Sequence, residues 1–479
     1  MATLPARRTS PSARTLAALL ALAAAPVALA QAAGAGESPL FTDPVLAELV
    51  SQSLAARPEL RQAEATARAG RERVDQAGAL PDPILSLGIQ NDGFQELQIG
   101  KMETSYWQVM ITQPLPWPGK RGLRTDVARL VAEEANAGVG RARLTAEADV
   151  RRAYLDLLVA RDRLELLGRL EAIWRTSAGV ARARYESGEG AQSDVLRAQL
   201  ELNRIRQRRI ALASQETAAI QALNRLRNRP VLEPVPTTAT VAKLGAPEPP
   251  PLDAALSDAV ARSPELAQAK AATARTRTGA DLARRERYPD LAVNAGIMPR
   301  GSLDPMWTAG LSVGLPIWAG RKQSRAVAES EARAEGGARG EEALEQILRL
   351  RVAERRNVAL ALLDTVRVFR EGLLVQSRAT AESTLAQYRV GKVSFASVLE
   401  ANAGLVADED GHLGAVADAQ RVAIAAAEVS LDPVFGPGAA PIGRGGMPGA
   451  GALRSGGAPS AGAEGGAAEA AAGGMAPGM

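Results

Sequence analysis

The sequence predicts a mainly helical protein that also carries two β-hairpins, built from one helix, hairpin and long-helix unit that occurs twice. The first observation is the composition: the 479 residues are rich in alanine and only 3% are aromatic. This is typical of long, closely packed helices, since so few aromatics cannot fill several compact cores. The second is that four short motifs recur in the same order about two hundred residues apart. The third is a period of two in two pairs of short segments, which indicates β-strands.

Residues 1–30 have the three-part pattern of a secretory signal peptide. Arg7, Arg8 and Arg14 precede an apolar run over residues 16–25, and Ala28-Leu29-Ala30 forms a small-residue cleavage site. The alternative, a short membrane anchor, is disfavoured because the run is shorter than the roughly 20 residues that span a bilayer. We therefore expect an exported chain that begins at Gln31.

The charge of the mature chain does not favour a nucleic-acid partner. The whole sequence carries a formal charge of +4. Three of these charges belong to the leader, so the remainder is almost neutral and offers no basic stripe for phosphates.

The residue types also exclude most catalytic and metal chemistry. The chain has no cysteine and a single histidine, His412, so it cannot form a disulfide, a thiolate site or a two-histidine metal site. Gly119-Lys120 lacks the spacing of a phosphate-binding loop, and Arg121 follows it instead of Ser or Thr. We expect no enzyme activity, no cofactor and no bound metal.

The four recurring motifs divide the chain into two copies of one unit. The pairs are Arg57-Pro58-Glu59-Leu60 with Ser263-Pro264-Glu265-Leu266, Pro81-Asp82 with Pro289-Asp290, Gly119-Lys120 with Gly320-Arg321, and Tyr185 to Leu196 with Tyr388 to Leu399. Residues 31–228 and 252–432 form the two predicted repeats. Residues 229–251 are rich in proline and should be an extended connector. Residues 433–479 contain mostly Gly, Ala, Pro and Met, and we expect them to be disordered.

Each repeat should begin with helix and continue into a hairpin. Residues 44–79 favour a helix, which Pro81 and Pro83 end. Strands are predicted at residues 84–91, 107–112, 291–297 and 307–314, because apolar and small polar residues alternate there. Their apolar faces are Leu85, Leu87 and Ile89; Trp107, Val109 and Ile111; Leu291, Val293, Ala295 and Ile297; and Trp307, Ala309, Leu311 and Val313.

Two features of these strands indicate a membrane rather than the alternative, ordinary antiparallel strands with one face in water. Their second face carries small and polar residues but almost no charge. Four tryptophans bracket the hairpins, and separations of 10 and 11 residues correspond to roughly 25 Å along tilted strands, the height of an outer-membrane apolar band. They are Trp107, Trp117, Trp307 and Trp318.

Four strands per chain cannot close a barrel, because the smallest barrels use about eight strands. An open strand edge is not tolerated in lipid. We therefore expect several chains to share one transmembrane β-barrel, and three chains would give twelve strands.

Residues 120–187 contain no proline and predict one long helix. Its coiled-coil stripe is predicted to be Val150, Tyr154, Leu157, Leu164 and Leu167. The second repeat should have a matching helix over residues 320–390. Its stripe is predicted to be Ala359, Leu362, Val366, Phe369 and Leu373.

A glycine should end each long helix. Gly188 and Gly391 can adopt the left-handed backbone conformation that reverses the chain at a helix C-terminus. Returning helices are expected to begin near Ser193 and Ser394.

With these features the chain resembles the TolC-type outer membrane efflux proteins over roughly residues 40–432. The resemblance rests on the duplicated order, on Tyr-x-x-Gly followed by Val-Leu at each helix tip, and on Gln113-Pro114-Leu115-Pro116-Trp117-Pro118-Gly119-Lys120-Arg121 with its echo at residues 315–321. It implies a homotrimer whose twelve-stranded outer-membrane barrel continues into a periplasmic α-helical barrel. It also implies a passive exit duct that works with a periplasmic adaptor and an inner-membrane pump.

The resemblance further implies roles for residues at the two helix tips. Those expected to meet the adaptor and close the pore are Tyr185, Gly188, Val195, Leu196, Tyr388, Gly391, Val398 and Leu399. Asp194 aligns with an acid of the closing network, whose usual arginine partner is Val393 here, and Glu400 aligns with an inward acidic position. The alternative is that Asp194 and Glu400 are solvated acids near helix N-termini, stabilised by the helix dipole.

Two more implications concern partners and anchoring. The sequence of residues 117–121, Trp-Pro-Gly-Lys-Arg, is similar to that of the heavy-metal branch of the family. The partners of that branch are resistance-nodulation-division pumps. Lipidated relatives begin with an acylated cysteine, which this Cys-free chain lacks. The alternative function is a soluble periplasmic coiled-coil scaffold, which would share the helices but has no use for two Trp-bracketed hairpins.

Overall fold

The computed structural model describes residues 38–433, so the predicted signal peptide and the predicted disorder from residue 434 onward lie outside the described residues. The chain divides into two compact units. Within the described residues, unit 1 comprises the chain up to Arg161, Ser214–Val366 and the segment from Val416, whereas unit 2 comprises Asp162–Ala213 and Arg367–Ala415. Each unit therefore contains segments of both sequence repeats.

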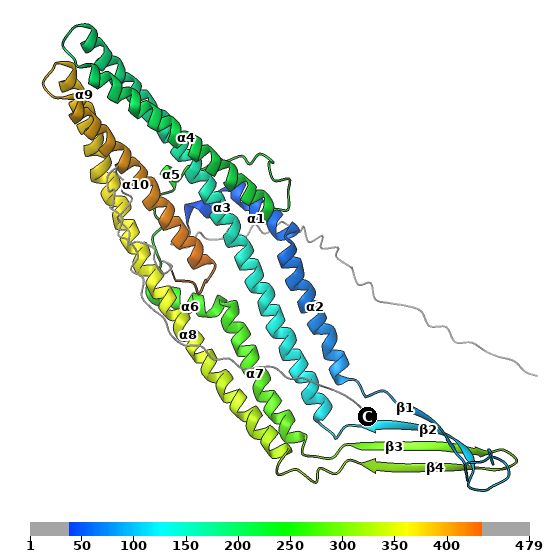
Figure 1. The fold of residues 1–479 in the computed structure, drawn as a ribbon. Coiled ribbons are helices and arrows are strands. Elements are labelled where there is room, and N and C mark those ends of the chain that lie inside the picture. The colour runs from blue at the N-terminus through cyan, green and yellow to red at the C-terminus, as the bar shows by residue number, and fades with distance from the viewer. Residues whose placement is uncertain (1–37, 434–479) are drawn as a thin grey trace, which may run out of the picture. The chain divides into compact units, whose positions relative to one another are not determined.

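The structure is mainly helical with four strands, which confirms the predicted fold class (Figure 1). The elements of the first repeat are η1 (Pro39–Thr42), α1 (Pro44–Ala56), α2 (Pro58–Gly78), β1 (Ile84–Gln90), β2 (Tyr106–Leu115), α3 (Lys120–Glu186) and α4 (Gln192–Leu226). The connector holds α5 (Val241–Leu244), and the second repeat has α6 (Leu252–Arg262), α7 (Pro264–Arg285), β3 (Leu291–Arg300), β4 (Leu303–Val313), α8 (Gln323–Val368), the π-helix η2 (Phe369–Leu373), α9 (Leu374–Arg389) and α10 (Phe395–Ala427). No helix within residues 38–433 has the length and apolarity needed to cross a membrane.

The prediction of one helix over residues 44–79 is wrong, because the segment forms two helices. Arg57 separates α1 from α2 with an extended backbone, φ −66° and ψ 121°. Its neighbour Pro58 is the cause, since the proline ring clashes with a helical conformation of the preceding residue. Pro264 acts in the same way on Ser263, which separates α6 from α7.

The two long helices also differ from each other. The prediction for the first repeat is confirmed, because α3 is a single helix of 67 residues. In the second repeat, the π-helix lies between α8 and α9. A π-turn inserts a residue and rotates the next turns of the helix, so Leu362 and Val366 are buried whereas Leu373 is exposed. The prediction that Leu373 continues the buried stripe is wrong.

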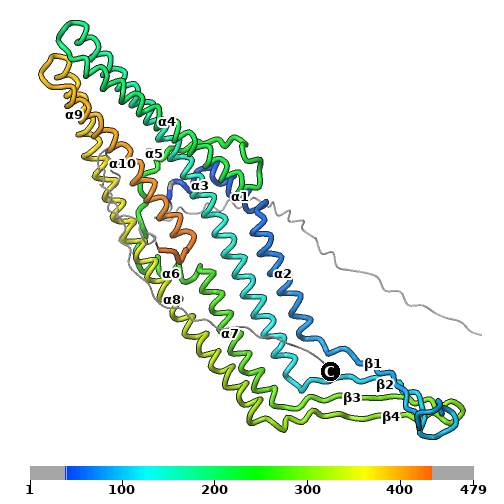
Figure 2. The backbone as a smooth tube through the Cα atoms, viewed as in Figure 1, coloured from blue at the N-terminus to red at the C-terminus, as the bar shows by residue number. Residues whose placement is uncertain are grey.

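The backbones of α2, α3, α7 and α8 in unit 1 can be followed in Figure 2, and small residues and ion pairs join these helices. A Cβ placed on Gly70 of α2 would lie only 3.4 Å from the Cα of Ala132 in α3, so these helices approach closely. Glu134 of α3 pairs with Arg275 of α7 at 3.3 Å. Arg284 of α7 pairs with Glu331 of α8 at 2.7 Å.

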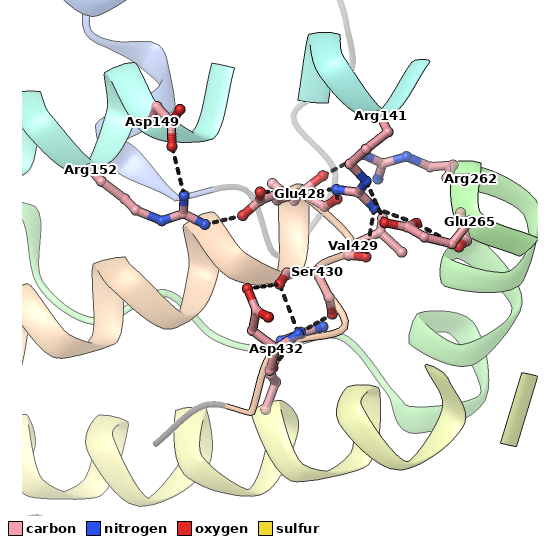
Figure 3. Close-up of polar contacts among 12 residues, drawn as sticks. Arg141, Asp149, Arg152, Arg262, Glu265, Glu428, Val429, Ser430 and Asp432 are labelled. Atoms are coloured by element: carbon pink, nitrogen blue, oxygen red, sulfur yellow. Dashed lines mark hydrogen bonds and ion pairs between the residues drawn. The ribbon is translucent and has the colours of Figure 1, made fainter. Parts of the chain in front are cut away.

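A polar cluster in unit 1 holds the segment that ends α10 (Figure 3). Glu428 accepts a hydrogen bond from the guanidinium of Arg152, and Arg141 Nη1 donates to the Glu428 carbonyl oxygen at 3.1 Å. Arg141 also pairs with Glu265, a residue of the recurring Pro-Glu-Leu motif. The motif therefore ties the start of α7 to the middle of α3.

The four strands form one antiparallel sheet in the order β1-β2-β3-β4. Ile89 lies opposite Trp107 in the first hairpin, and Ile297 lies opposite Trp307 in the second. The hairpins meet through β2 and β3, where Val109 lies opposite Ile297. β1 and β4 are the two edges of the sheet within one chain.

Candidate functional site

The first candidate surface is the apolar face of the sheet in unit 1. Paired strands place apolar residues opposite apolar residues across all four strands; one such row runs Leu87, Val109, Ile297, Trp307. Leu87, Ile297 and Trp307 of this row are 73%, 56% and 79% exposed. Exposing such a continuous apolar band to water is unfavourable, so it is expected to face lipid or a partner.

The opposite face of the sheet carries mainly small and polar residues. No charged residue occurs within residues 84–90, 106–115, 291–299 and 305–313. Asn294 Nδ2 donates to Ser312 Oγ at 3.1 Å across β3 and β4. Tyr106 Oη donates to Gln90 Oε1 at 2.6 Å across β1 and β2. The sheet thus has one apolar face and one neutral, hydrogen-bonding face.

The four predicted interface tryptophans are not equivalent in the structure. Trp107, Trp307 and Trp318 are exposed. Trp117 is only half-exposed, because its ring stacks on Tyr288 with centroids 5.6 Å apart and planes 10° apart. Trp117 and Tyr288 belong to different repeats, so this contact strengthens the junction between β2 and β3.

The second candidate surface is the pair of helix turns in unit 2. Gly188 and Gly391 have φ values of 79° and 71°, which confirms the predicted left-handed reversal. The amides of Gly188 and Gly391 donate to the carbonyl oxygens of Tyr185 and Tyr388, both at 3.1 Å. The next amides, Glu189 and Lys392, reach back five residues, which completes a Schellman motif in each repeat.

The two turn tyrosines nevertheless differ in environment. Tyr388 is 2% exposed and packs against Phe395 with ring centroids 5.3 Å apart. Tyr185 is 47% exposed, and the residue that corresponds to Phe395 in the first repeat is the polar Gln192. Phe395 is therefore one contact that buries Tyr388 and that the turn of the first repeat lacks.

The turn of the second repeat is bound to residues of the first repeat. Tyr388 Oη donates to Asp194 Oδ2 at 3.2 Å. The guanidinium carbon of Arg184 lies 5.0 Å from the Tyr388 ring centroid, and Arg184 Nη1 donates to the Tyr388 carbonyl oxygen. Burial, together with the charge and hydrogen bond of Asp194, raises the pKa of Tyr388 to about 12, while Arg184 acts in the opposite direction.

Arg184 is the residue that sequence reasoning missed at this site. The family resemblance places the cation near Asp194 at position 393, which is Val393 here, whereas Arg184 of α3 contacts Tyr388 in the same turn. Its signal in the sequence is its place in the last turn of a helix, where basic side chains commonly bind free carbonyl oxygens.

The other predicted tip residues lie at different depths. Val398 is fully buried, whereas Leu196 is 57% exposed. Val195 and Leu399 are half-exposed, and Glu400 is exposed near the start of α10. The structure therefore brings Asp194 to Tyr388 but leaves Glu400 in solvent.

No group of three or more metal-ligating His, Asp or Glu side chains gathers within residues 38–433.

Comparisons with known proteins are consistent with this architecture. The family model described as outer membrane efflux protein matches residues 49–229 and 255–428. Protein CyaE of Bordetella pertussis (strain Tohama I) is 29% identical over 177 residues, which span 36% of this chain and 37% of that relative.

Solved structures are similar over a larger share of the chain. The outer-membrane channel OprN matches with a TM-score of 0.68 at 21% identity, covering 82% of this chain and 93% of its own. CusC matches with a TM-score of 0.70 at 17% identity, covering 81% and 92%. At these identities the likeness shows the fold.

Proposed function

Because the chain belongs to the outer membrane efflux protein family, we propose that it is the outer-membrane channel of a tripartite efflux system. Three copies would form a passive exit duct that docks to a periplasmic adaptor and an inner-membrane resistance-nodulation-division pump. The duct would couple no energy itself, and its exported chain would lack an N-terminal lipid because it has no cysteine.

The observation that carries the proposal is the four-stranded sheet, which has one exposed apolar face and whose only charged residues are Arg300 and Asp304 at the hairpin end of β3 and β4. A band of apolar side chains across β1 to β4 suits lipid, and the neutral face suits a water-filled lumen. The sheet has two edges per chain, and pairing between copies would remove them, as a membrane requires. The alternative, a soluble periplasmic coiled-coil scaffold, gives no role to this surface.

We place the adaptor contact and the gate at the turns of unit 2. Tyr185 and Leu196 expose apolar surface in the turn of the first repeat, which suits an adaptor contact. Tyr388, Asp194 and Arg184 hold the turn of the second repeat, which suits a gate. The predicted acidic role of Glu400 stays a proposal, since its exposed position fits both a pore acid and a solvated helix end.

The gate is tested by single-channel recording of Asp194→Ala. This variant should raise the resting conductance only modestly, because Arg184 still binds the Tyr388 carbonyl oxygen. Arg184→Met should raise it more, since it removes both the hydrogen bond and the contact with the ring. If both variants conduct as the unchanged protein does, this turn is not the gate.

We propose heavy-metal cations as the first cargo to test, because the sequence of residues 117–121 resembles that of the heavy-metal branch of the family. A deletion strain should become sensitive to heavy-metal salts and regain tolerance with the unchanged gene. Unaltered tolerance together with sensitivity to organic toxicants would assign another cargo to the same duct.

The decisive experiment for the channel itself is purification in mild detergent, followed by native mass spectrometry and planar-bilayer recording. A trimer that conducts ions supports the proposal. A protein recovered from the periplasm without detergent, with no conductance, would instead favour the scaffold.

A further inference from the structure

The pairing of β2 with β3 indicates how β4 of one copy would pair with β1 of another copy. It joins the hairpin of the first repeat to that of the second. In the proposed trimer six similar hairpins would succeed one another, so β4 of each copy would meet β1 of the next. A seam of this kind between copies rests on the proposed function, because it exists only if the chains share one barrel.

The internal repeat fixes how the strands correspond. The pair Ile89 and Trp107 in the first hairpin has the same place as Ile297 and Trp307 in the second. This correspondence carries β1 onto β3 and β2 onto β4 residue by residue. The register of β2 against β3 can therefore be transferred to β4 against β1.

The transferred register gives definite partners between copies. Thr112 lies opposite Asn294, so Ser312 would lie opposite Ser86 of the next copy. Likewise Ile111 lies opposite Ala295, which places Leu311 opposite Leu87. Apolar residues meet apolar residues and serines meet serines, whereas a slip of one residue would reverse the faces of one strand.

The base of the same contact supplies a second, independent observation. Lys120 Nζ lies 2.8 Å from Asp290 Oδ1 where β2 and β3 meet the helices. The recurring motifs make Arg321 the counterpart of Lys120 and Asp82 the counterpart of Asp290. Lys120 is buried, but Arg321 and Asp82 are both exposed, and within residues 38–433 neither side chain has a hydrogen bond or ion pair.

The apolar contact beside this pair repeats as well. Trp117 stacks on Tyr288 inside the chain, and the counterparts of these residues are Trp318 and Leu80. Both counterparts are exposed. One edge of the sheet thus offers a cation and an indole, and the other offers a carboxylate and an aliphatic side chain.

We propose that β4 of one copy pairs with β1 of the next in the register that sets Ser312 opposite Ser86, and that an Arg321–Asp82 ion pair between copies closes the base of this seam. The partner is a second copy of this chain, chosen by strand register and charge complementarity.

The register is tested by disulfide crosslinking, for which the Cys-free sequence is a clean background. Directly opposed strand residues have Cβ atoms about 4.5–5.5 Å apart, within reach of a disulfide after small adjustments. In outer membranes oxidised with copper phenanthroline, Ser86→Cys/Ser312→Cys should give covalent dimers and trimers that dithiothreitol returns to monomers. The matched control Gln90→Cys/Ser312→Cys, four residues out of register, should stay monomeric on the gel.

The ion pair is tested by charge exchange. Asp82→Arg and Arg321→Asp should each lower the temperature at which the trimer dissociates in detergent, and the double variant Asp82→Arg/Arg321→Asp should recover much of that loss. A double variant that loses the sum of both effects would overturn the ion pair, whatever the crosslinks show.

The outcomes also separate this inference from the proposed function. A conducting trimer in which the out-of-register pair crosslinks, or in which the Ser86→Cys/Ser312→Cys pair does not, overturns the register and leaves the channel intact. A protein that is monomeric by native mass spectrometry overturns the trimeric channel itself.

Discussion

Lys120 Nζ lies 2.8 Å from Asp290 Oδ1 and 2.8 Å from the Tyr288 carbonyl oxygen. The first residue of α3 therefore binds two residues that immediately precede β3. The Trp117 amide donates to the same Asp290 oxygen at 2.8 Å. The side chain of Lys120 is only 4% exposed. Both repeats of one chain are joined here, at the base of the sheet.

Asp290→Asn should therefore destabilise the protein by about 1 to 2 kcal/mol, because it leaves a buried ammonium without its carboxylate. Thermal dissociation of the trimer in detergent measures this. Asp126→Asn is the matched control, since Asp126 pairs with Arg129 on an exposed helix surface and such pairs contribute about 0–1 kcal/mol. Equal effects of the two variants would show that burial of Lys120 is unimportant.

Gly391→Val should destabilise its turn by about 1 to 2 kcal/mol or more, because a β-branched residue disfavours a φ of 71°. A Cβ at Gly391 would also lie 3.1 Å from Arg184 Nη2, whereas one at Gly188 meets nothing within 4 Å. The cost of Gly391→Val should therefore exceed that of Gly188→Val. Hydrogen exchange of the turn amides in the intact trimer measures both.

The control for these glycines is Gly404→Ala, at an open position inside α10, where alanine should be neutral or stabilising by up to about 1 kcal/mol. Gly391→Val should still assemble in the outer membrane but raise the resting conductance, because Gly391 lies in the turn that we propose as the gate. A resting conductance equal to that of the unchanged protein would remove this turn from the proposed gate.

Leu311→Arg should impair membrane assembly, because Leu311 lies on the exposed apolar face of β4 and an arginine deep in lipid costs about 2 to 4 kcal/mol. Ser312→Arg should assemble and shift ion selectivity toward anions, because Ser312 lies on the polar face with Asn294. Reversal potentials in a salt gradient provide the measurement. The opposite pattern would mean that the two faces are exchanged.

Acid should weaken unit 2 through His412, the single histidine of the chain. Burial lowers its pKa, the charge of Arg370 adds to this effect, and Glu409 opposes it. The folded state thus favours neutral imidazole, so this contribution is complete above the unfolded value near 6.5 and is lost as pH falls through it toward the folded pKa. Unfolding of unit 2, followed by hydrogen exchange at pH 8 and pH 5.5, should show less acid sensitivity in His412→Gln than in the unchanged protein.

Much of the fold can be predicted from the sequence because its signals are local. Alternation over residues 84–90 and 291–297 assigns both the strands and their apolar faces, since successive side chains of a strand point in opposite directions. Gly188 and Gly391 mark the two helix ends because only glycine adopts positive φ without strain. The proline of the Pro-Glu-Leu motif is an equally local signal for the break at Arg57, which the prediction of one helix over residues 44–79 overlooks.

Other features depended on contacts between distant residues. Nothing near Leu373 in the sequence marks the π-helix that exposes it, although Phe369 of that helix packs against His412 of α10. Likewise, Tyr185 and Tyr388 have the same local motif, but only Tyr388 receives Arg184, Asp194 and Phe395. The sequence alone determined the four strands, the long first-repeat helix and the two glycine turns, because backbone preference and periodicity act over a few residues. The tertiary structure decided which turn is closed and how Lys120 meets Asp290, because those contacts join residues far apart in the chain, whose approach is set by packing rather than by local conformation.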